Sequence, residues 1–324
     1  MHYDCRIADD LLICTLTPDR ALSSAVFCCS GMSAMAPVMG GTLVRALGSY
    51  TEIALPDMPA NQPYTFHLHY TDGFKPANRA WKPLGPYLRI GDDIVALPPT
   101  PAGRITPELG DPPDLDVLPL VPQPSSWTPT GAVIAIDGFA ASGAAMDAVA
   151  ALATRQGAGF RGLHPVTITH EDMPQDAYRL IIDADGIRIF SGSYGGTFYA
   201  GITLFTLLRN GPLPCGEIID APRFAWRGQH LDTARHYYEP CSITALLDLM
   251  AMLKLNRFHW HFADDEAFRI ELDTLPELTE KLALRGEGQL LPALFCGSPC
   301  EGGTYSKDTA RDIIAHAAAL NIDV

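Results

Sequence analysis

The sequence predicts a multi-domain protein with an all-β sandwich, then a small α+β domain, then the first part of a (β/α)8 TIM barrel. Three successive patterns along the 324 residues lead to this prediction. Short apolar runs broken by turn residues fill residues 1–120, and mixed helix and strand patterns fill 121–222. A strand, a helix and another strand open residues 223–324. We take these ranges as the domain bounds.

Alternation of apolar and polar residues identifies the strands of the first domain. In Tyr64–Tyr70 every second residue is aromatic or aliphatic, and Thr or His stands between them, as in a strand with one buried face. Other predicted strands are Leu11–Leu16, Thr42–Leu47 and Tyr87–Ile90. The next stretch, Leu97–Pro129, is rich in proline, which disfavours helices and central strands. We expect a linker there.

The second domain shows alternating helix and strand signals. Expected elements are a strand Ala132–Ile136, a helix Ala144–Arg155, a strand Val166–Thr169, a hairpin of Tyr178–Asp183 with Ile187–Phe190, and a helix Ile202–Arg209. Glycines in Ser191–Gly201 do not form a phosphate-binding loop, because no Gly-Lys-Ser/Thr follows them. We expect a turn from hairpin to helix.

The third domain begins with a βαβ pattern. The strand Ala225–Thr233 precedes a helix capped by Ser242, and the strand Arg257–Ala263 follows. The inward helix positions are Ile243, Leu246, Leu247, Met250 and Leu253. Such units are parallel and right-handed almost without exception. A further helix reaches about Leu320, and Asn321–Val324 begin a third strand.

Two strands and the start of a third cannot close a barrel of eight strands. An apolar parallel edge would also be left unpaired. We therefore expect the sequence to be the N-terminal part of a protein that continues past Val324. About forty residues follow Asp264 before the next helix, and long loops at the carboxyl ends of parallel strands usually form the functional face.

Composition excludes some classes of partner. A net charge of −14 and a pI near 5.0 argue against nucleic acid and anionic membrane surfaces. No apolar run is long enough to cross a bilayer, and the N-terminus does not resemble a signal peptide, so we expect a cytoplasmic protein. Eight cysteines in so long a chain do not indicate a disulfide scaffold. The sequence does not reveal an oligomeric state.

Arg235 follows the first strand of the third domain, where a barrel places its ligand contacts. A guanidinium is a rigid fork of donors that suits paired hydroxyls or a carboxylate. An ion pair with Asp232 or Glu239 is an equally good explanation on spacing alone.

His259 and His261 share one face of the second strand, because alternate residues of a strand point the same way. This pattern is found in metal-dependent barrel hydrolases, but there it is expected on the first strand. Packing inside the barrel is the simpler interpretation.

Asp264 and Asp265 are adjacent and should diverge in an extended chain. They do not form the facing carboxyl pair, about 5 to 9 Å apart, that most glycosidases use. We expect Asp264 to face the pocket, since it comes first after the strand.

Several motifs together resemble those of the family-20 glycoside hydrolases, the β-N-acetylhexosaminidases. They are Trp226–Gly228, Leu231–Asp232, Arg235–Tyr237, Lys254–Asp265, Phe268–Glu271 and Leu275–Thr279. The preceding domain is similar to the small α+β domain of the family through Gly195–Leu204. The resemblance covers about residues 120–324, and it is much weaker for the β-rich N-terminal part.

The resemblance implies hydrolysis of terminal N-acetylglucosamine or N-acetylgalactosamine with retention, in which the acetamido oxygen of the substrate is the nucleophile. By position, Arg235 would bind hydroxyls of the sugar and Asp264 would orient the catalytic groups through a histidine. Asp232, His259 and His261 would support the site. The implied partners are N-acetylhexosamine-terminated glycosides, with no cofactor and no metal.

The sequence departs from the family in one respect. The Asp-Glu dyad of the family, with Glu as general acid/base, and its Asp-x-Pro-Gly-His segment are not found in residues 1–324. We expect the Glu and its partner Asp to lie beyond Val324, and we expect this chain to be inactive alone. Two alternatives stay open: a metal-dependent barrel hydrolase that uses His259 and His261, and a non-catalytic carbohydrate-binding protein.

Overall fold

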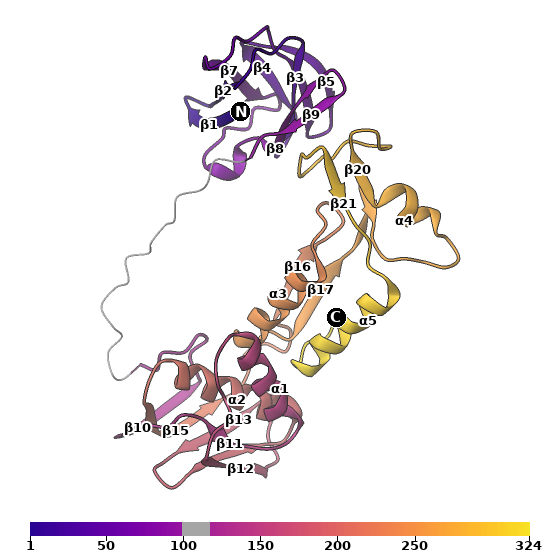
Figure 1. Ribbon diagram of the computed structural model, residues 1–324. Helices are drawn as coiled ribbons and strands as arrows, with labels where there is room; N and C mark the ends of the chain where they lie inside the picture. Colours follow the sequence, from indigo (N-terminus) through magenta and orange to yellow (C-terminus); the bar gives the residue numbers. More distant parts are fainter. Residues whose placement is uncertain (99–116) are drawn as a thin grey trace. The chain divides into compact units, whose positions relative to one another are not determined.

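The computed structural model describes residues 1–98 and 117–324 (Figure 1). These residues divide into two compact units. The first contains the N-terminal residues to 98 together with 232–238 and 261–307, and the second contains 117–231, 239–260 and 308–324. The predicted bounds of three domains, 1–120, 121–222 and 223–324, stay a prediction.

The N-terminal part of the first unit is a sandwich of two antiparallel sheets. Its strands are β1 (His2–Ala8), β2 (Leu11–Thr17), β3 (Ala25–Ser30), β4 (Met35–Met39), β5 (Thr42–Leu47), β6 (Tyr50–Ala54), β7 (Tyr64–Tyr70), β8 (Leu84–Ile90) and β9 (Asp93–Ala96), with a short helix η1 (Arg79–Trp81). One sheet has the order β1-β2-β7-β4 and the other β5-β6-β3-β8-β9. We call this part the N-terminal sandwich.

Both sheets contribute to one apolar core, as the alternation in the sequence predicted. Phe66 and Leu68 of β7 are fully buried against Phe27 of β3 and Leu88 of β8. The rings of Phe27 and Phe66 meet edge to face with their centroids 4.9 Å apart, a favoured aromatic geometry. All four strands expected in this part are present.

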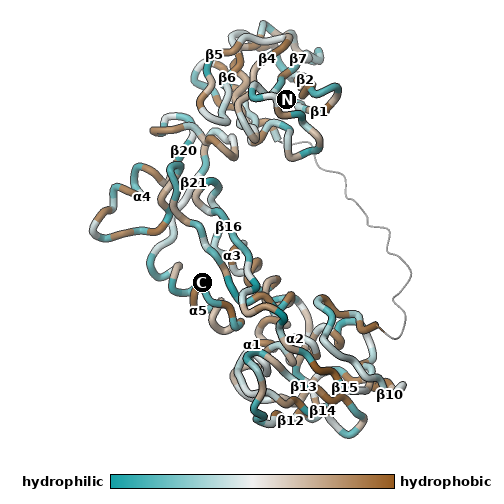
Figure 2. Tube along the Cα trace, turned by 180° about the vertical axis from the view of Figure 1, so that it is seen from behind, coloured by the Kyte–Doolittle hydropathy of each residue, from teal (hydrophilic) through white to brown (hydrophobic). Residues whose placement is uncertain are grey.

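The second unit contains a mixed sheet with two helices. Its elements are β10 (Ser126–Ile134), β11 (Phe139–Ala140), α1 (Ala144–Arg155), β12 (His164–His170), β13 (Tyr178–Ile182), β14 (Ile187–Ser191), α2 (Tyr194–Arg209) and β15 (Leu213–Asp220). The strand order is β10-β15-β13-β14-β12-β11. Helix α2 packs on α1 and against β13 and β14, and Figure 2 shows hydrophobic stretches around α2 and β15.

Two expectations for this unit are wrong. Residues 126–129 belong to β10 rather than to a linker. The sheet accommodates Pro129 because β10 is an edge strand. On the side of an edge strand that has no neighbour, the missing N–H of proline loses no hydrogen bond. The remainder of the expected linker is described only at 97–98 and 117–125, since 99–116 lie outside the described residues.

The expected turn at Ser191–Gly201 is largely helix. Helix α2 begins at Tyr194, and the Ser193 side chain caps it by accepting a hydrogen bond from the Gly196 amide at 3.1 Å. A Cβ on Gly195 would lie 2.0 Å from Oδ1 of Asp176, and one on Gly196 would lie 2.3 Å from the carbonyl of Ala177. The glycines therefore allow close packing, and this outweighs their low helix propensity.

The C-terminal third contains short strands and helices from both units. They are β16 (Gly228–Asp232), α3 (Pro240–Met252), β17 (Arg257–His261), β18 (Ala263–Asp264), β19 (Ala267–Phe268), α4 (Glu277–Leu282), β20 (Leu284–Gly286), β21 (Cys300–Gly302) and α5 (Lys307–Ala319). β16 pairs with β17. In the described part of the chain, no helix has the length and apolar character to span a membrane.

The expected strand, helix and strand are present, with shorter strands than predicted. Helix α3 begins at Pro240 rather than after Ser242, because proline suits the first turn, where its missing N–H has no partner to lose. Ile243, Leu247 and Met250 are buried as predicted, whereas Leu253 follows the helix and is partly exposed.

The third strand, expected from Asn321 to Val324, is reduced to a single bridge. Asp323 forms a parallel bridge with Arg257, and its carbonyl accepts a hydrogen bond from the Phe258 amide at 2.8 Å. Asn321 lies in a turn, and Val324 lies outside the bridge with 48% of its surface exposed. A strand needs hydrogen bonds to its neighbour along several residues. Among the described residues 321–324, only Asp323 forms such bonds with the segment at β17.

Candidate functional site

The turn after β16 sets the position of Arg235. The Oδ1 atom of Asp232 accepts hydrogen bonds from the amides of Ala234 and Arg235, each at 3.0 Å. An aspartate that binds amides two and three residues ahead fixes a tight turn. The Arg235 side chain consequently leaves the chain at a defined point just past the end of β16.

The guanidinium of Arg235 is surrounded by carboxylates. Its nitrogens lie 2.8 Å from Oδ2 of Asp232, 2.7 Å from Oδ2 of Asp264 and 3.1 Å from Oε2 of Glu266. The pair with Asp232 is the ion pair that the sequence left as an alternative. The Arg235 side chain is nevertheless 37% exposed, so part of it still faces solvent. We call Arg235 with these three carboxylates the Arg235 cluster.

Two carboxylates of the Arg235 cluster have lowered pKa values. Burial alone would raise the pKa of Asp232, but hydrogen bonds from the backbone and side chain of Arg235 lower that pKa overall. Contacts with the side chain and amide of Asp265, then with His261, hold the pKa of Asp264 well below its usual value, and Arg235 adds to this effect. Both groups are therefore charged at neutral pH.

Glu266 behaves differently from its neighbours. Its side chain is 8% exposed, and burial raises its pKa even though Arg235 acts in the opposite direction. The contact with Nε of Arg235 is ionic and lacks the alignment of a hydrogen bond. Sequence reasoning did not single out Glu266, although its place directly after two aspartates was a signal.

The two histidines of β17 have different surroundings. Nε2 of His261 lies 2.7 Å from Oδ2 of Asp264, which accepts its hydrogen bond. The ring of His259 meets the ring of His230 edge on, with centroids 4.7 Å apart. Asp264 therefore contacts both His261 and Arg235, as a residue that orients its neighbours would. Metal binding by His259 and His261 was only an alternative to packing, and it stays untested.

A fully buried arginine lies beneath the turn that carries Arg235. Arg269 donates hydrogen bonds to the carbonyls of Thr233 at 3.0 Å and Ala234 at 2.8 Å, and it pairs with Glu301 at 3.2 Å. These charge-assisted bonds hold the backbone on either side of Ala234. Phe295, which sequence reasoning also missed, lies with its ring centroid 5.8 Å from Cζ of Arg235.

Comparison with known proteins identifies the family. Residues 117–221 match glycosyl hydrolase family 20, domain 2, and residues 224–324 match glycosyl hydrolase family 20, catalytic domain. The chain belongs to glycoside hydrolase family 20.

Curated family-20 relatives include a beta-hexosaminidase of Vibrio furnissii, 33% identical over 282 residues, or 81% of this chain and 45% of that protein. An N,N'-diacetylchitobiase of Vibrio harveyi is 38% identical over 217 residues, or 60% of this chain and 25% of that protein. The chain thus spans less than half the length of these relatives.

The fold is also that of a solved family-20 structure. The exo beta-N-acetylglucosaminidase from Vibrio harveyi, in complex with N-acetylglucosamine, matches 99% of this chain and 56% of its own with a TM-score of 0.74. At 24% identity this likeness concerns the fold alone.

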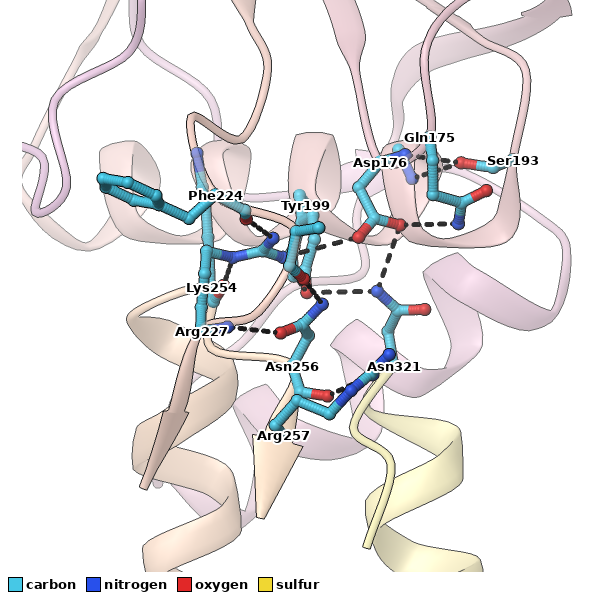
Figure 3. A network of polar contacts seen from close by, with 12 residues as sticks. Gln175, Asp176, Ser193, Tyr199, Phe224, Arg227, Lys254, Asn256, Arg257 and Asn321 are labelled. Carbon is cyan, nitrogen blue, oxygen red and sulfur yellow. Dashed lines mark hydrogen bonds and ion pairs between the residues drawn. The ribbon is translucent and has the colours of Figure 1, made fainter. Parts of the chain in front are cut away.

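Other motif residues of this family-20 chain have structural partners (Figure 3). Arg227 donates to the carbonyls of Phe224 and Lys254, each at 2.8 Å, and to the hydroxyl of Tyr199 at 3.1 Å. Asn256 accepts from the Arg227 amide at 2.9 Å. These bonds join the residue before β16 to the segment before β17, so Arg227 and Asn256 set the strand starts.

The low pKa of Asp264 predicts a specific effect of pH. Its ionised form stabilises the folded state above the unfolded pKa of about 3.9, and this contribution is lost as the pH falls through the lower folded pKa. We expect Asp264→Asn to unfold more easily at neutral pH and to lose less stability than wild type between about pH 4 and 2. Urea unfolding at several pH values measures both effects, and Asp185→Asn in the β13–β14 turn is the control. Parallel stability curves for wild type and Asp264→Asn would contradict the assignment.

Proposed function

We propose that this chain carries part of the sugar site of a β-N-acetylhexosaminidase, which hydrolyses terminal N-acetylglucosamine or N-acetylgalactosamine glycosides with retention. Membership of family 20 and the names of the relatives, beta-hexosaminidase and chitobiase, support this proposal. The observation that carries it is the Arg235 cluster, in which carboxylates fix the guanidinium of a side chain that is still partly exposed.

In this proposal residues 223–324 form the first βαβ units of a (β/α)8 barrel. The succession β16, α3 and β17 supports it. So does the position of the candidate residues, because Arg235 comes shortly after the end of β16 and Asp264 shortly after the end of β17. Barrel enzymes place their active sites at these ends.

Arg235 would donate hydrogen bonds to hydroxyls of the terminal sugar. Its guanidinium is already held by Asp232 and Asp264, so little side-chain entropy is lost when a ligand binds. Asp264 would act as a supporting residue, since its carboxylate fixes the ring of His261 as well as Arg235. The acetamido oxygen of the substrate would attack the anomeric carbon, so no enzyme nucleophile is needed.

The proton donor in this proposal is not one of the three carboxylates of the Arg235 cluster. Asp232 and Asp264 have lowered pKa values and are poor proton donors at neutral pH. Glu266 has the raised pKa that a general acid needs, but it is buried against Arg235. We assign the Glu general acid/base and its Asp partner to positions beyond Val324.

Sugar binding tests the role of Arg235. We expect residues 1–324 to bind the methyl β-glycoside of N-acetylglucosamine, and Arg235→Ala to weaken binding roughly tenfold or more, because charge-assisted hydrogen bonds are lost. Calorimetric titration measures the affinity. Arg311→Ala, at an exposed ion pair with Asp308 in α5, is the matched control and should bind as wild type does. Equal affinity of Arg235→Ala and wild type would refute the proposed site.

Turnover tests the assignment of the proton donor. Residues 1–324 should not release nitrophenol from 4-nitrophenyl N-acetyl-β-D-glucosaminide, because the Arg235 cluster supplies no suitable acid. Release that is abolished by Glu266→Gln would identify Glu266 as the acid and overturn the assignment. Asp185→Asn controls for changes in carboxylate number.

A further inference from the structure

An apolar ring, that of Phe295, lies beside the charged guanidinium of Arg235. The Phe295 ring centroid is 5.8 Å from Cζ of Arg235, and the two side chains are 39% and 37% exposed. A sugar has hydroxyls at its edge and C–H groups on its faces. Ligand sites combine aromatic walls with a few placed polar groups for such molecules. Phe295 is therefore suited to contact the face of a sugar whose hydroxyls bind Arg235.

The backbone beside Phe295 is held by the N-terminal sandwich. The Ser30 hydroxyl donates to the carbonyl of Ala293 at 2.7 Å, and the Ser49 hydroxyl donates to the carbonyl of Leu294. Both serines are buried from water, so these bonds also give their hydroxyls a hydrogen-bond partner. Two consecutive carbonyls directly before Phe295 are thus fixed by side chains from β3 and from the turn before β6.

Contacts after Phe295 also come from the sandwich. The Ser298 amide donates to the carbonyl of Gly85 at 2.9 Å. A Cβ on Gly297 would lie 1.8 Å from the carbonyl of Leu84, and one on Gly85 would lie 2.5 Å from the carbonyl of Cys296. Both glycines have positive φ, +60° and +50°, a region that other residues avoid. The two backbones therefore meet at a distance that only glycine permits.

A charged contact fixes the same segment further upstream. Glu287 accepts hydrogen bonds from the Tyr87 hydroxyl at 2.7 Å and from Nη1 of Arg89 at 2.9 Å. Arg89 is itself paired with the buried Glu52 at 2.8 Å. Leu294 packs against a small buried cluster of the sandwich formed by Cys28, Tyr50 and Tyr87. The segment 287–298 is consequently bound to the sandwich along its length.

We propose that the N-terminal sandwich positions Phe295 as an apolar wall of the sugar site beside Arg235. Its bonds go to the backbone on both sides of Phe295, which fixes the position of the ring rather than merely burying a surface. The sandwich then holds a residue of the sugar site in place, and Phe295 contacts the face of the bound N-acetylhexosamine. The role of Phe295 rests on the proposed function; the positioning by the sandwich does not.

Hydrogen exchange on residues 1–324 tests the positioning. The double variant Ser30→Ala, Ser49→Ala should speed exchange of amides 293–298 by roughly tenfold, because two hydrogen bonds to this segment are lost. The matched control is Thr15→Ala, Thr65→Ala, which removes an exposed hydroxyl pair of the same sandwich and should leave that exchange unchanged. Glu287→Gln, at a partly exposed site, is a second variant if the serine variant unfolds. Unchanged exchange in the folded variants would overturn the positioning.

Calorimetric titration with the methyl β-glycoside of N-acetylglucosamine tests the wall. Phe295→Ala should weaken binding roughly five- to tenfold, and Phe295→Tyr should retain it, because the ring supplies the contact. If Arg235→Ala loses affinity while Phe295→Ala does not, the proposed wall is wrong and the proposed function stands. If neither variant changes affinity, the proposed function fails, and the exchange experiment still decides whether the sandwich positions the segment.

Discussion

The site depends on one guanidinium shared among carboxylates that come from two strand ends. Asp232 ends β16 and Asp264 lies three residues after the end of β17, and a carboxylate oxygen of each lies within 2.8 Å of an Arg235 nitrogen. An ion pair that is partly out of water is stable only if its geometry is good and the remaining polar groups are satisfied. The turn at Asp232 and the buried Arg269 meet this condition, because they fix the backbone that carries Arg235.

The sequence predicted those parts of the structure that depend on local pattern. Strand Tyr64–Tyr70 and helix Ala144–Arg155 appear with the predicted bounds, since alternation and helical spacing decide them. The start of α2 was missed because Gly195 and Gly196 have low helix propensity and are retained for contacts with a distant loop. Tertiary packing, which a local sequence pattern does not show, determines where α2 begins.

The candidate site was predicted in a similar way. Arg235 and Asp264 were predicted as site residues because strand ends mark functional positions, and their role stays a prediction. The contact of Phe295 with Arg235 was not predicted because the two lie about sixty residues apart in the sequence, and Phe295 belongs to a long segment that bonds to the N-terminal sandwich. Glu266 was missed because only burial distinguishes it from an ordinary surface glutamate.

A crystal structure of residues 1–324 with the methyl β-glycoside of N-acetylglucosamine would show whether Arg235 binds the sugar. We expect sugar hydroxyls within hydrogen-bond distance of the Arg235 guanidinium, with Asp232 and Asp264 still paired to it and a face of the sugar on the Phe295 ring. A sugar bound elsewhere, with the Arg235 cluster closed and without ligand, would contradict this expectation.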